Sequence, residues 1–129
     1  MPEMRREGSR EPLRIVLGAI PPASLRGNSR AHWAKKYKDS RGWRESGYWH
    51  GVVELIEWRH VPKIRLTFLF RNKRKIDLDN LVSGGAMKAW VDGLQDAEVV
   101  ENDSPDHVIY GSHSFERGEP GMEILVEEL

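Results

Sequence analysis

Four apolar side chains stand at every second position between residues 63 and 70. They are Ile64, Leu66, Phe68 and Phe70, and the polar Lys63, Arg65 and Thr67 alternate with the first of them. Because successive side chains of a β-strand point to opposite faces, this alternation predicts a strand with one face buried. The half-buried strand constrains the fold more than any other segment of the chain.

The rest of the chain predicts five further elements. They are a strand at 13–20, a helix at about 43–58, a helix at about 86–94, and strands at 107–115 and 122–128. Pro21 and Pro22 end the first strand, and a polar surface loop follows. The turn-forming segment 117–121 favours a hairpin between the last two strands. The order β-α-β-α-β-β predicts a single α+β domain over residues 12–129, in which a mixed β-sheet packs with helices. Residues 1–11 are expected to be a flexible charged segment.

Length and composition restrict the class of protein further. The 129 residues suffice for one domain with one core, and 39% hydrophobic with 31% charged residues are typical of globular proteins rather than disordered or membrane proteins. No apolar run reaches the roughly 20 residues that span a bilayer, and the charged start of the chain lacks the apolar stretch of a secretory signal. We therefore expect a cytoplasmic, intracellular protein with no membrane partner.

The chain contains no cysteine. Disulfides, thiolate metal sites and cysteine nucleophiles are thereby excluded, and a metal ion would have oxygen or imidazole ligands. The five histidines lack the spacing of a zinc site, so we expect structural roles for them. Residues 83–89 do not have P-loop spacing. A hard cation is therefore the expected cofactor, and no organic cofactor is expected.

Positive and negative charges are separated along the chain. Lys plus Arg and Asp plus Glu each number 20, so the whole chain is neutral. Residues 1–75 contain 18 basic and 7 acidic residues, a net charge of +11, whereas residues 76–129 contain 2 and 13, a net charge of −11. The basic half suits a phosphate backbone and the acidic half can hold cations. Two halves that fold together with their charges on opposite faces would give the same pattern.

Aromatic and basic residues are interleaved between residues 32 and 58. Such a mixture can stack on bases and contact phosphates, although aromatics at helical spacing also form cores. Trp49 and Trp58 are expected in the core. The candidate DNA-binding residues of this region and the loop before it are Arg26, Asn28, Arg30, Lys35 and Lys36.

An acidic segment follows the half-buried strand. In extended backbone Asp77 and Asp79 point the same way, so both carboxylates can converge on one site. Asp103 offers a third carboxylate, and three carboxylates with water match the oxygen ligands that Mg²⁺ or Mn²⁺ prefers. Helix capping and a solvated turn would use Asp77 and Asp79 equally well. Spacing alone leaves the metal site and the structural role open.

Three short motifs resemble the RusA family of Holliday junction resolvases. They are Asp77-Leu78-Asp79-Asn80-Leu81, Lys88-Ala89-Trp90-Val91-Asp92-Gly93-Leu94 and Asn102-Asp103-Ser104, in this order. Residues 21–33 are similar to the opening loop of that family, so the resemblance extends from about residue 12 to the end of the chain.

The chain departs from the RusA pattern at two places, the position of the lysine and Asn102, which replaces the first of the family's paired acids before Ser104. The family's lysine follows the second aspartate by four residues, where Ser83 stands here, whereas Lys88 follows Asp79 by nine. A five-residue insertion that contains Gly84 and Gly85 accounts for the shift.

The resemblance implies a RusA-like fold and a Mg²⁺-dependent endodeoxyribonuclease, with Mn²⁺ as the alternative metal. It further implies a homodimer that cuts four-way DNA junctions in recombination, repair or phage DNA processing. Asp77, Asp79, Asp103 and Lys88 would be catalytic, and the three aspartates would be the metal ligands. The basic run Lys73, Arg74 and Lys75 would hold flanking phosphates, although a solvated strand end that prevents edge pairing would use the same cations equally well. Val91, Leu94 and the strand at 122–128 are candidates for the dimer interface.

Three functions remain open at this level. The favoured one is an active junction endonuclease. A module that binds branched DNA without cutting it would follow if the insertion displaces Lys88 from the site. A small metal-binding structural or interaction protein would hold cations with its acidic half and an acidic partner with its basic half.

Overall fold

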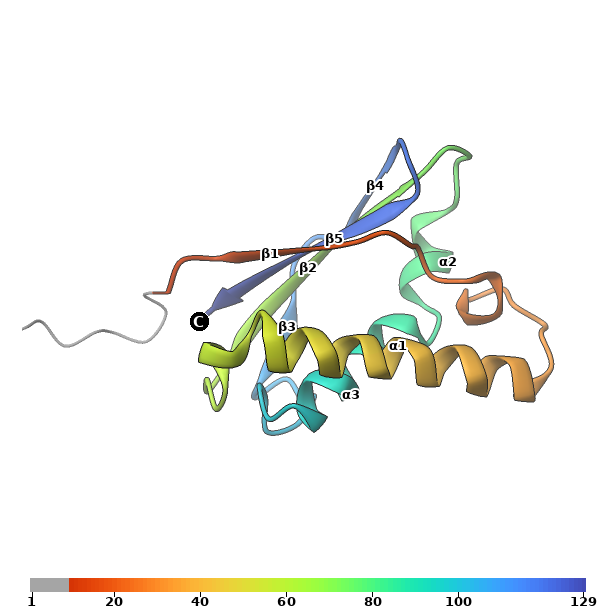
Figure 1. Ribbon diagram of the computed structural model, residues 1–129. Coiled ribbons are helices and arrows are strands. Elements are labelled where there is room, and N and C mark those ends of the chain that lie inside the picture. Colours follow the sequence, from red (N-terminus) through yellow and green to blue (C-terminus); the bar gives the residue numbers. More distant parts are fainter. Residues whose placement is uncertain (1–9) are drawn as a thin grey trace, which may run out of the picture.

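In residues 10–129, the part of the chain that the computed structural model describes, a five-stranded mixed sheet carries helices on one face (Figure 1). The strands are β1 (Leu13–Leu17), β2 (Ile64–Asn72), β3 (Val108–Tyr110), β4 (Ser114–Arg117) and β5 (Gly121–Glu128). The helices are α1 (Trp33–Val53), α2 (Leu78–Val82) and α3 (Ala86–Asp96), with the short 3-10 helices η1 (Ala23–Leu25) and η2 (Ile56–Trp58). The predicted α+β domain with a mixed sheet is confirmed.

β2 lies in the centre of the sheet. It pairs antiparallel with β5 on one side and parallel with β3 and β4 on the other, and β1 pairs with β5. Ile64, Leu66, Phe68 and Phe70 are completely buried. The ring of Phe68 meets that of Trp90 of α3 edge to face, with 6.4 Å between the centroids. The predicted half-buried strand is confirmed.

The opposite face of the sheet carries ion pairs. Arg65 of β2 pairs with Glu127 of β5 at 3.0 Å. Glu123 of β5 pairs with Arg71 of β2 and, at 3.0 Å, with Arg14 of β1. Opposite charges on neighbouring strands stabilise a sheet. Each pair joins a cation of the basic half to an anion of the acidic half, so the two halves of the chain fold together.

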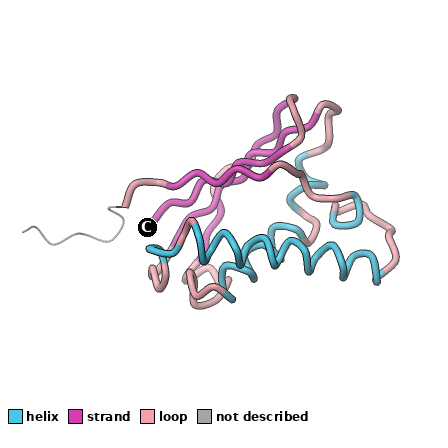
Figure 2. Tube along the Cα trace, in the orientation of Figure 1, coloured by secondary structure: helices cyan, strands magenta, loops and turns pink. Residues whose placement is uncertain are grey.

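α1 and α3 lie side by side on the buried face of the sheet, as both ribbon and tube show (Figures 1 and 2). A Cβ added to Gly47 of α1 would lie 1.9 Å from the Trp90 carbonyl oxygen, and one added to Gly93 of α3 would lie 2.1 Å from the Arg44 carbonyl oxygen. Only glycine permits two helix backbones to approach this closely. Arg44 also pairs with Asp96 at 2.7 Å across the same contact.

The first helix starts earlier and ends earlier than predicted. The sequence predicts residues 43–58, whereas α1 spans Trp33–Val53 and is followed by a turn and η2. His32 caps the start of α1, because its Nδ1 accepts the backbone N–H of Ala34 at 3.1 Å. Trp58 is buried as predicted, but the prediction for Trp49 is wrong, since its surface is 61% exposed. The second predicted helix is confirmed and extends to Asp96.

The predicted hairpin at the end of the chain is wrong. β4 and β5 pair with opposite edges of β2, so β2 lies between the two strands that residues 117–121 connect. The predicted strand at 107–115 is divided, because residues 111–113 stand opposite only residues 67–68 of β2. One extra residue of this kind is a β-bulge. The backbone N–H of Phe68 donates there to Nδ1 of His113 at 3.0 Å.

The residues predicted for a dimer interface lie inside the domain. Val91 and Leu94 are completely buried in the core. β5 is paired along both of its edges, by β1 and β2. The prediction is wrong for Val91 and Leu94, which the core already buries, whereas for β5 the structure excludes only pairing through a strand edge.

Two remaining predictions concern the start of the chain and membranes. The predicted flexible segment at 1–11 lies mostly outside the described residues. Arg10, at its end, donates to the Glu57 carbonyl oxygen at 2.7 Å, pairs with Glu128 at 3.3 Å and lies 5.7 Å from the centroid of the Trp58 ring. Within residues 10–129, none of the helices has the length and apolar character needed to cross a bilayer.

Candidate functional site

Lys88 and Asp92 of α3 and Asp103 of the loop after α3 form a charged cluster, which we call the Lys88 cluster. Lys88 Nζ donates to Asp103 Oδ2 at 2.9 Å and to Asp92 Oδ1 at 3.3 Å. Lys88 and Asp92 stand one helical turn apart, and Asp103 comes from the loop after α3. Two of the four residues predicted to be catalytic, Lys88 and Asp103, are therefore in direct contact.

The two carboxylates keep the lysine charged. The hydrogen bond to Asp103 raises the pKa of Lys88, and Asp92 adds to this effect. The ammonium group in turn lowers the pKa of Asp103. Lys88 is therefore a cation at neutral pH rather than a general base, and it can neutralise negative charge on a phosphate. Its side chain is 69% exposed, so an anion from solvent can reach it.

Tyr110, at the end of β3, lies close to the Lys88 cluster, and the sequence analysis does not identify it. Burial raises the pKa of the Tyr110 hydroxyl, and the negative charge of Asp103 raises it further. The hydroxyl therefore stays protonated and can donate a hydrogen bond beside the cluster. The signal in the sequence is Gly111, which follows Tyr110 at the bulge, and bulges are frequent next to active sites.

Asp77 and Asp79 lie at the start of α2. Asp77 is the N-cap residue, with φ −60° and ψ 127°, and Asp79 stands in the first helical turn. The expected extended backbone through both residues is wrong, because only Asp77 is extended and the helix begins at Leu78. Acidic side chains at this end of a helix interact favourably with its dipole, so a structural role accounts for both residues as well.

Whether the site can hold a metal ion depends on the three predicted ligands, Asp77, Asp79 and Asp103. In the described part of the chain, no three His, Asp or Glu side chains are grouped closely enough to hold a metal ion. Asp77 and Asp79 are exposed, and Asp103 is engaged by Lys88. Mg²⁺ in proteins is often held by one or two carboxylates together with water and substrate phosphates. Asp77 and Asp79 fit an ion held in that way, but the predicted set of three aspartates is not assembled in residues 10–129.

The loop at 23–28 packs against the segment that carries the acidic motif. The backbone N–H of Gly27 donates to the Asn80 carbonyl oxygen at 2.7 Å. A Cβ added to Gly84 would lie 1.5 Å from the Leu25 carbonyl oxygen, so the two backbones touch. The insertion at Gly84 therefore forms a contact with the opening loop and brings the basic loop next to α2.

The predicted DNA-binding residues lie in two segments, residues 26–36 before and at the start of α1, and residues 73–75 in the loop between β2 and α2 (Figure 1). Lys35 pairs with Asp39 at 3.0 Å, and Lys73 pairs with Glu119 at 3.5 Å. Asn28 is exposed in the loop before α1. The other predicted cations form no ion pair with the residues that the structure describes. They are Arg26, Arg30, Lys36, Arg74 and Lys75.

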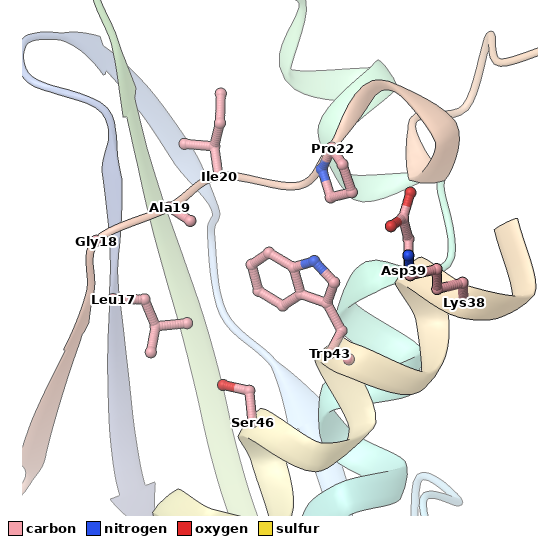
Figure 3. Close-up of a pocket in the computed structure, with 10 residues that line it drawn as sticks. Leu17, Gly18, Ala19, Ile20, Pro22, Lys38, Asp39, Trp43 and Ser46 are labelled. Atoms are coloured by element: carbon pink, nitrogen blue, oxygen red, sulfur yellow. The ribbon is translucent and has the colours of Figure 1, made fainter. Parts of the chain in front are cut away.

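A separate hollow of about 600 Å³ lies between the end of β1 and α1 (Figure 3). Leu17, Ala19, Ile20 and Pro22 line it, and the indole of Trp43 points into it. None of the predicted site residues lines this hollow. It is therefore distinct from the candidate site.

Comparisons with known proteins do not identify a family. No protein-family model matches the chain, and no curated protein matches it significantly. The resemblance to RusA resolvases therefore rests on the short motifs.

Proposed function

We propose that this protein is a metal-dependent endodeoxyribonuclease that resolves Holliday junctions by paired symmetric nicks, as the resemblance to the RusA family implies. The observation that supports the proposal is the contact of Lys88 with Asp103 at 2.9 Å. These are the lysine and the aspartate that the resemblance assigns to one site. The contact exists although the insertion at Gly84 and Gly85 shifts Lys88 along the chain.

Each residue has a defined part in the proposed reaction. Asp77 and Asp79 would hold Mg²⁺ or Mn²⁺ together with water and substrate phosphates, and Asp103 would join them only after it leaves Lys88. When bound, such an ion supplies Lewis acidity at the phosphate and acidifies water. Lys88 neutralises the charge that develops on the phosphate, or assists the leaving oxygen. A phosphate that approaches Lys88 competes with Asp103 for the ammonium group, so binding of DNA frees the carboxylate of Asp103.

DNA binding in this proposal depends on cations that carboxylates do not neutralise. Arg26, Arg30, Lys36, Arg74 and Lys75 supply them beside α2. Their contacts with phosphates position the DNA without reading its sequence. Two copies related by a two-fold axis would present two sites to the symmetry-related strands of a four-way junction.

A cleavage assay with matched aspartate variants tests the proposal. The substrates are a labelled synthetic four-way junction and a linear duplex of the same sequence, each with Mg²⁺ and with EDTA. We expect symmetric cuts in the junction alone, only with Mg²⁺. Asp79→Asn, Asp103→Asn and Lys88→Ala should each lower the rate about a hundredfold or more, because each removes charge from the reacting phosphate's surroundings. Asp106→Asn changes an exposed aspartate near Asp103 and should leave the rate unchanged.

Two outcomes would contradict the endonuclease. Cleavage that survives in Asp79→Asn and Asp103→Asn would show that the assigned residues do not act. Tight binding of the junction without cleavage in Mg²⁺ or Mn²⁺ would favour the second candidate, a module that recognises branched DNA. The observation that favours this second candidate is that Asp77, Asp79 and Asp103 are not assembled into a metal-binding group within residues 10–129.

A further inference from the structure

A groove extends from the first turn of α1 to the Lys88 cluster. Its wider part is a hollow of about 620 Å³ between α1, the opening loop and the insertion at residues 83–85. A smaller hollow of about 290 Å³ between α1 and α3 continues it. Tyr37 and Ser40 line both hollows, and the smaller one reaches Asp92, a partner of Lys88. The groove therefore leads directly to the candidate site.

Two exposed aromatic rings stand at the wide end of the groove. Trp33 is 72% exposed and Tyr37 is 65% exposed, and both line the wider hollow. They stand four residues apart on α1, so they share one face of the helix. A single exposed aromatic needs no explanation, but two adjacent rings facing one hollow form a platform on which planar groups can stack.

Cations accompany the two rings. Arg26 and Lys36 line the same hollow, and neither forms an ion pair within the described part of the chain. Arg41 and Arg44 line the smaller hollow and are paired with Glu45 at 3.6 Å and Asp96 at 2.7 Å. The wide end therefore combines uncompensated positive charge with aromatic surface, which suits an anion that carries a flat ring.

The insertion supplies the wall opposite the rings. Ser83, Gly84 and Gly85 line the wider hollow, and the close contact of Gly84 with Leu25 fixes their position. A Cβ on Gly85 would meet only the Leu25 side chain, at 3.9 Å, so there is room beside this residue. Gly85 is the N-cap of α3 and has φ −85°, which other residues adopt readily.

We propose that this groove binds unpaired nucleotides of single-stranded DNA. Their bases stack on Trp33 and Tyr37, and their phosphates contact Lys36 and Arg26. The strand then continues along α1 toward Lys88. This inference rests on the proposed function, because the centre of a branched DNA is the source of the unpaired strand. The inference adds to the proposed function a binding site for unpaired bases. The insertion at residues 83–85 forms one wall of this site, which gives the insertion a role of its own.

Binding of a short oligonucleotide tests the inference without any cleavage. A fluorescein-labelled thymidine oligonucleotide is titrated with the full chain in EDTA, and anisotropy gives the dissociation constant. Base stacking on an aromatic side chain contributes about 1–3 kcal/mol per base, so Trp33→Ala and Tyr37→Ala should each weaken binding about five- to hundredfold. Binding of the oligonucleotide should also quench tryptophan emission in the wild type and less in Trp33→Ala.

Trp49→Ala is the matched control. Trp49 is 61% exposed on the same helix, but the helical period turns it about 160° away from Trp33. We expect the dissociation constant of Trp49→Ala for the oligonucleotide to stay within about twofold of the wild-type value. Gly85→Glu is a second variant, which adds a negative charge to the groove wall at a position with room for it, and it should weaken binding. Urea unfolding midpoints of all four variants should stay close to that of the wild type.

The outcomes separate this inference from the proposed function. Equal weakening by Trp49→Ala and Trp33→Ala, or tighter binding of a matching duplex than of the single strand, would overturn the inference. Junction cleavage that proceeds normally in Trp33→Ala and Tyr37→Ala would overturn it and leave the endonuclease standing. Single-strand binding that depends on Trp33, in a protein that cuts no junction, would support the inference and overturn the endonuclease.

Discussion

His113 shows how one side chain stabilises the sheet beside the candidate site. Its Nδ1 accepts the Phe68 N–H at 3.0 Å, where the bulge interrupts the pairing with β2. Its ring also lies 5.2 Å from the ring of Phe68 and 5.7 Å from that of Tyr110, measured between centroids. A protonated imidazole cannot accept a hydrogen bond at Nδ1, so this arrangement requires the neutral ring.

The stability of the fold should therefore depend on the protonation of His113. Burial lowers the pKa of His113 below its ordinary 6.5. Well above pH 6.5 the His113 ring is neutral in both the folded and the unfolded protein, so its hydrogen bond contributes fully to stability. As the pH falls below 6.5 the unfolded chain binds the proton first, so stability is lost until the lower folded pKa is reached. The urea midpoint of the wild type should fall more between pH 7.5 and pH 5.5 than that of His113→Asn. An identical fall in both proteins would contradict this role.

Single residues were predictable where the local chain determines their role. The capping of α1 by His32 and the burial of Trp58 agree with the expected structural roles. Tyr110 lies at a distance in sequence from Lys88, and only the pairing of β3 with β2 brings it there. No local pattern encodes that pairing.

At the scale of elements, α1 and α3 pack through glycines rather than through an apolar stripe. The buried residues of α1 are Gly47 and Gly51. A helix whose fully buried residues are glycines, with only Trp43 and Val52 packed on the core beside them, shows little apolar periodicity, so the sequence misplaces its start and assigns Trp49 to the core. The helix α3 has a strongly apolar face, and its prediction is confirmed.

Two glycine substitutions in α1 should have opposite effects on stability. Gly47→Ala places a Cβ 1.9 Å from the Trp90 carbonyl oxygen, so the helices must separate, at a cost of about 1–3 kcal/mol. Gly42→Ala meets nothing within 4 Å and should stabilise the helix by about 0.5–1 kcal/mol. Urea unfolding monitored by circular dichroism measures both. Equal effects of the two substitutions would contradict the close packing of α1 on α3.

The sequence predicts which strand residues are buried better than it predicts the order of the strands in the sheet. The alternation in β2 fixes which side chains are buried, but it does not state which strands flank it. The hairpin prediction failed because the turn at residues 117–121 passes around the end of β2 instead of joining neighbours. Strand order depends on long-range pairing, and a turn signal alone does not reveal it.

At the scale of the whole molecule, folding brings together many of the charges that are separated along the chain. Cations of the basic half pair with acidic residues of the other half across the sheet and helices, as Arg65 does with Glu127 and Arg59 with Glu98. The predicted cations without an ion pair in residues 10–129 lie in two segments, residues 26–36 at the start of α1 and residues 74–75 before α2. A net charge of zero therefore conceals two positive segments, which the distribution of charge along the sequence indicates.

The cations of residues 26–36 and 74–75 should make the affinity for DNA depend on the salt concentration. Lys36→Ala removes one of its cations, so the slope of log K against log salt concentration should become shallower by about 1. Lys63 precedes β2, at the opposite end from Arg74 and Lys75. Lys63→Ala should therefore leave the slope unchanged. Anisotropy titrations of a labelled junction at several salt concentrations measure both, and equal slopes in the two variants would contradict a localised DNA surface.

The pairing of β1 with β5 affects how the protein can fold during its synthesis on the ribosome. β1 is made early, yet in the described sheet its partner is β5, which is translated more than a hundred residues later. β2 likewise waits for β3, β4 and β5. Ile15 therefore lacks its partner strand until residues 122–126 have been made, and the sheet can close only after β5 has been synthesised. Folding this late leaves the apolar surface of β1 uncovered in the nascent chain, which favours aggregation unless that surface is shielded.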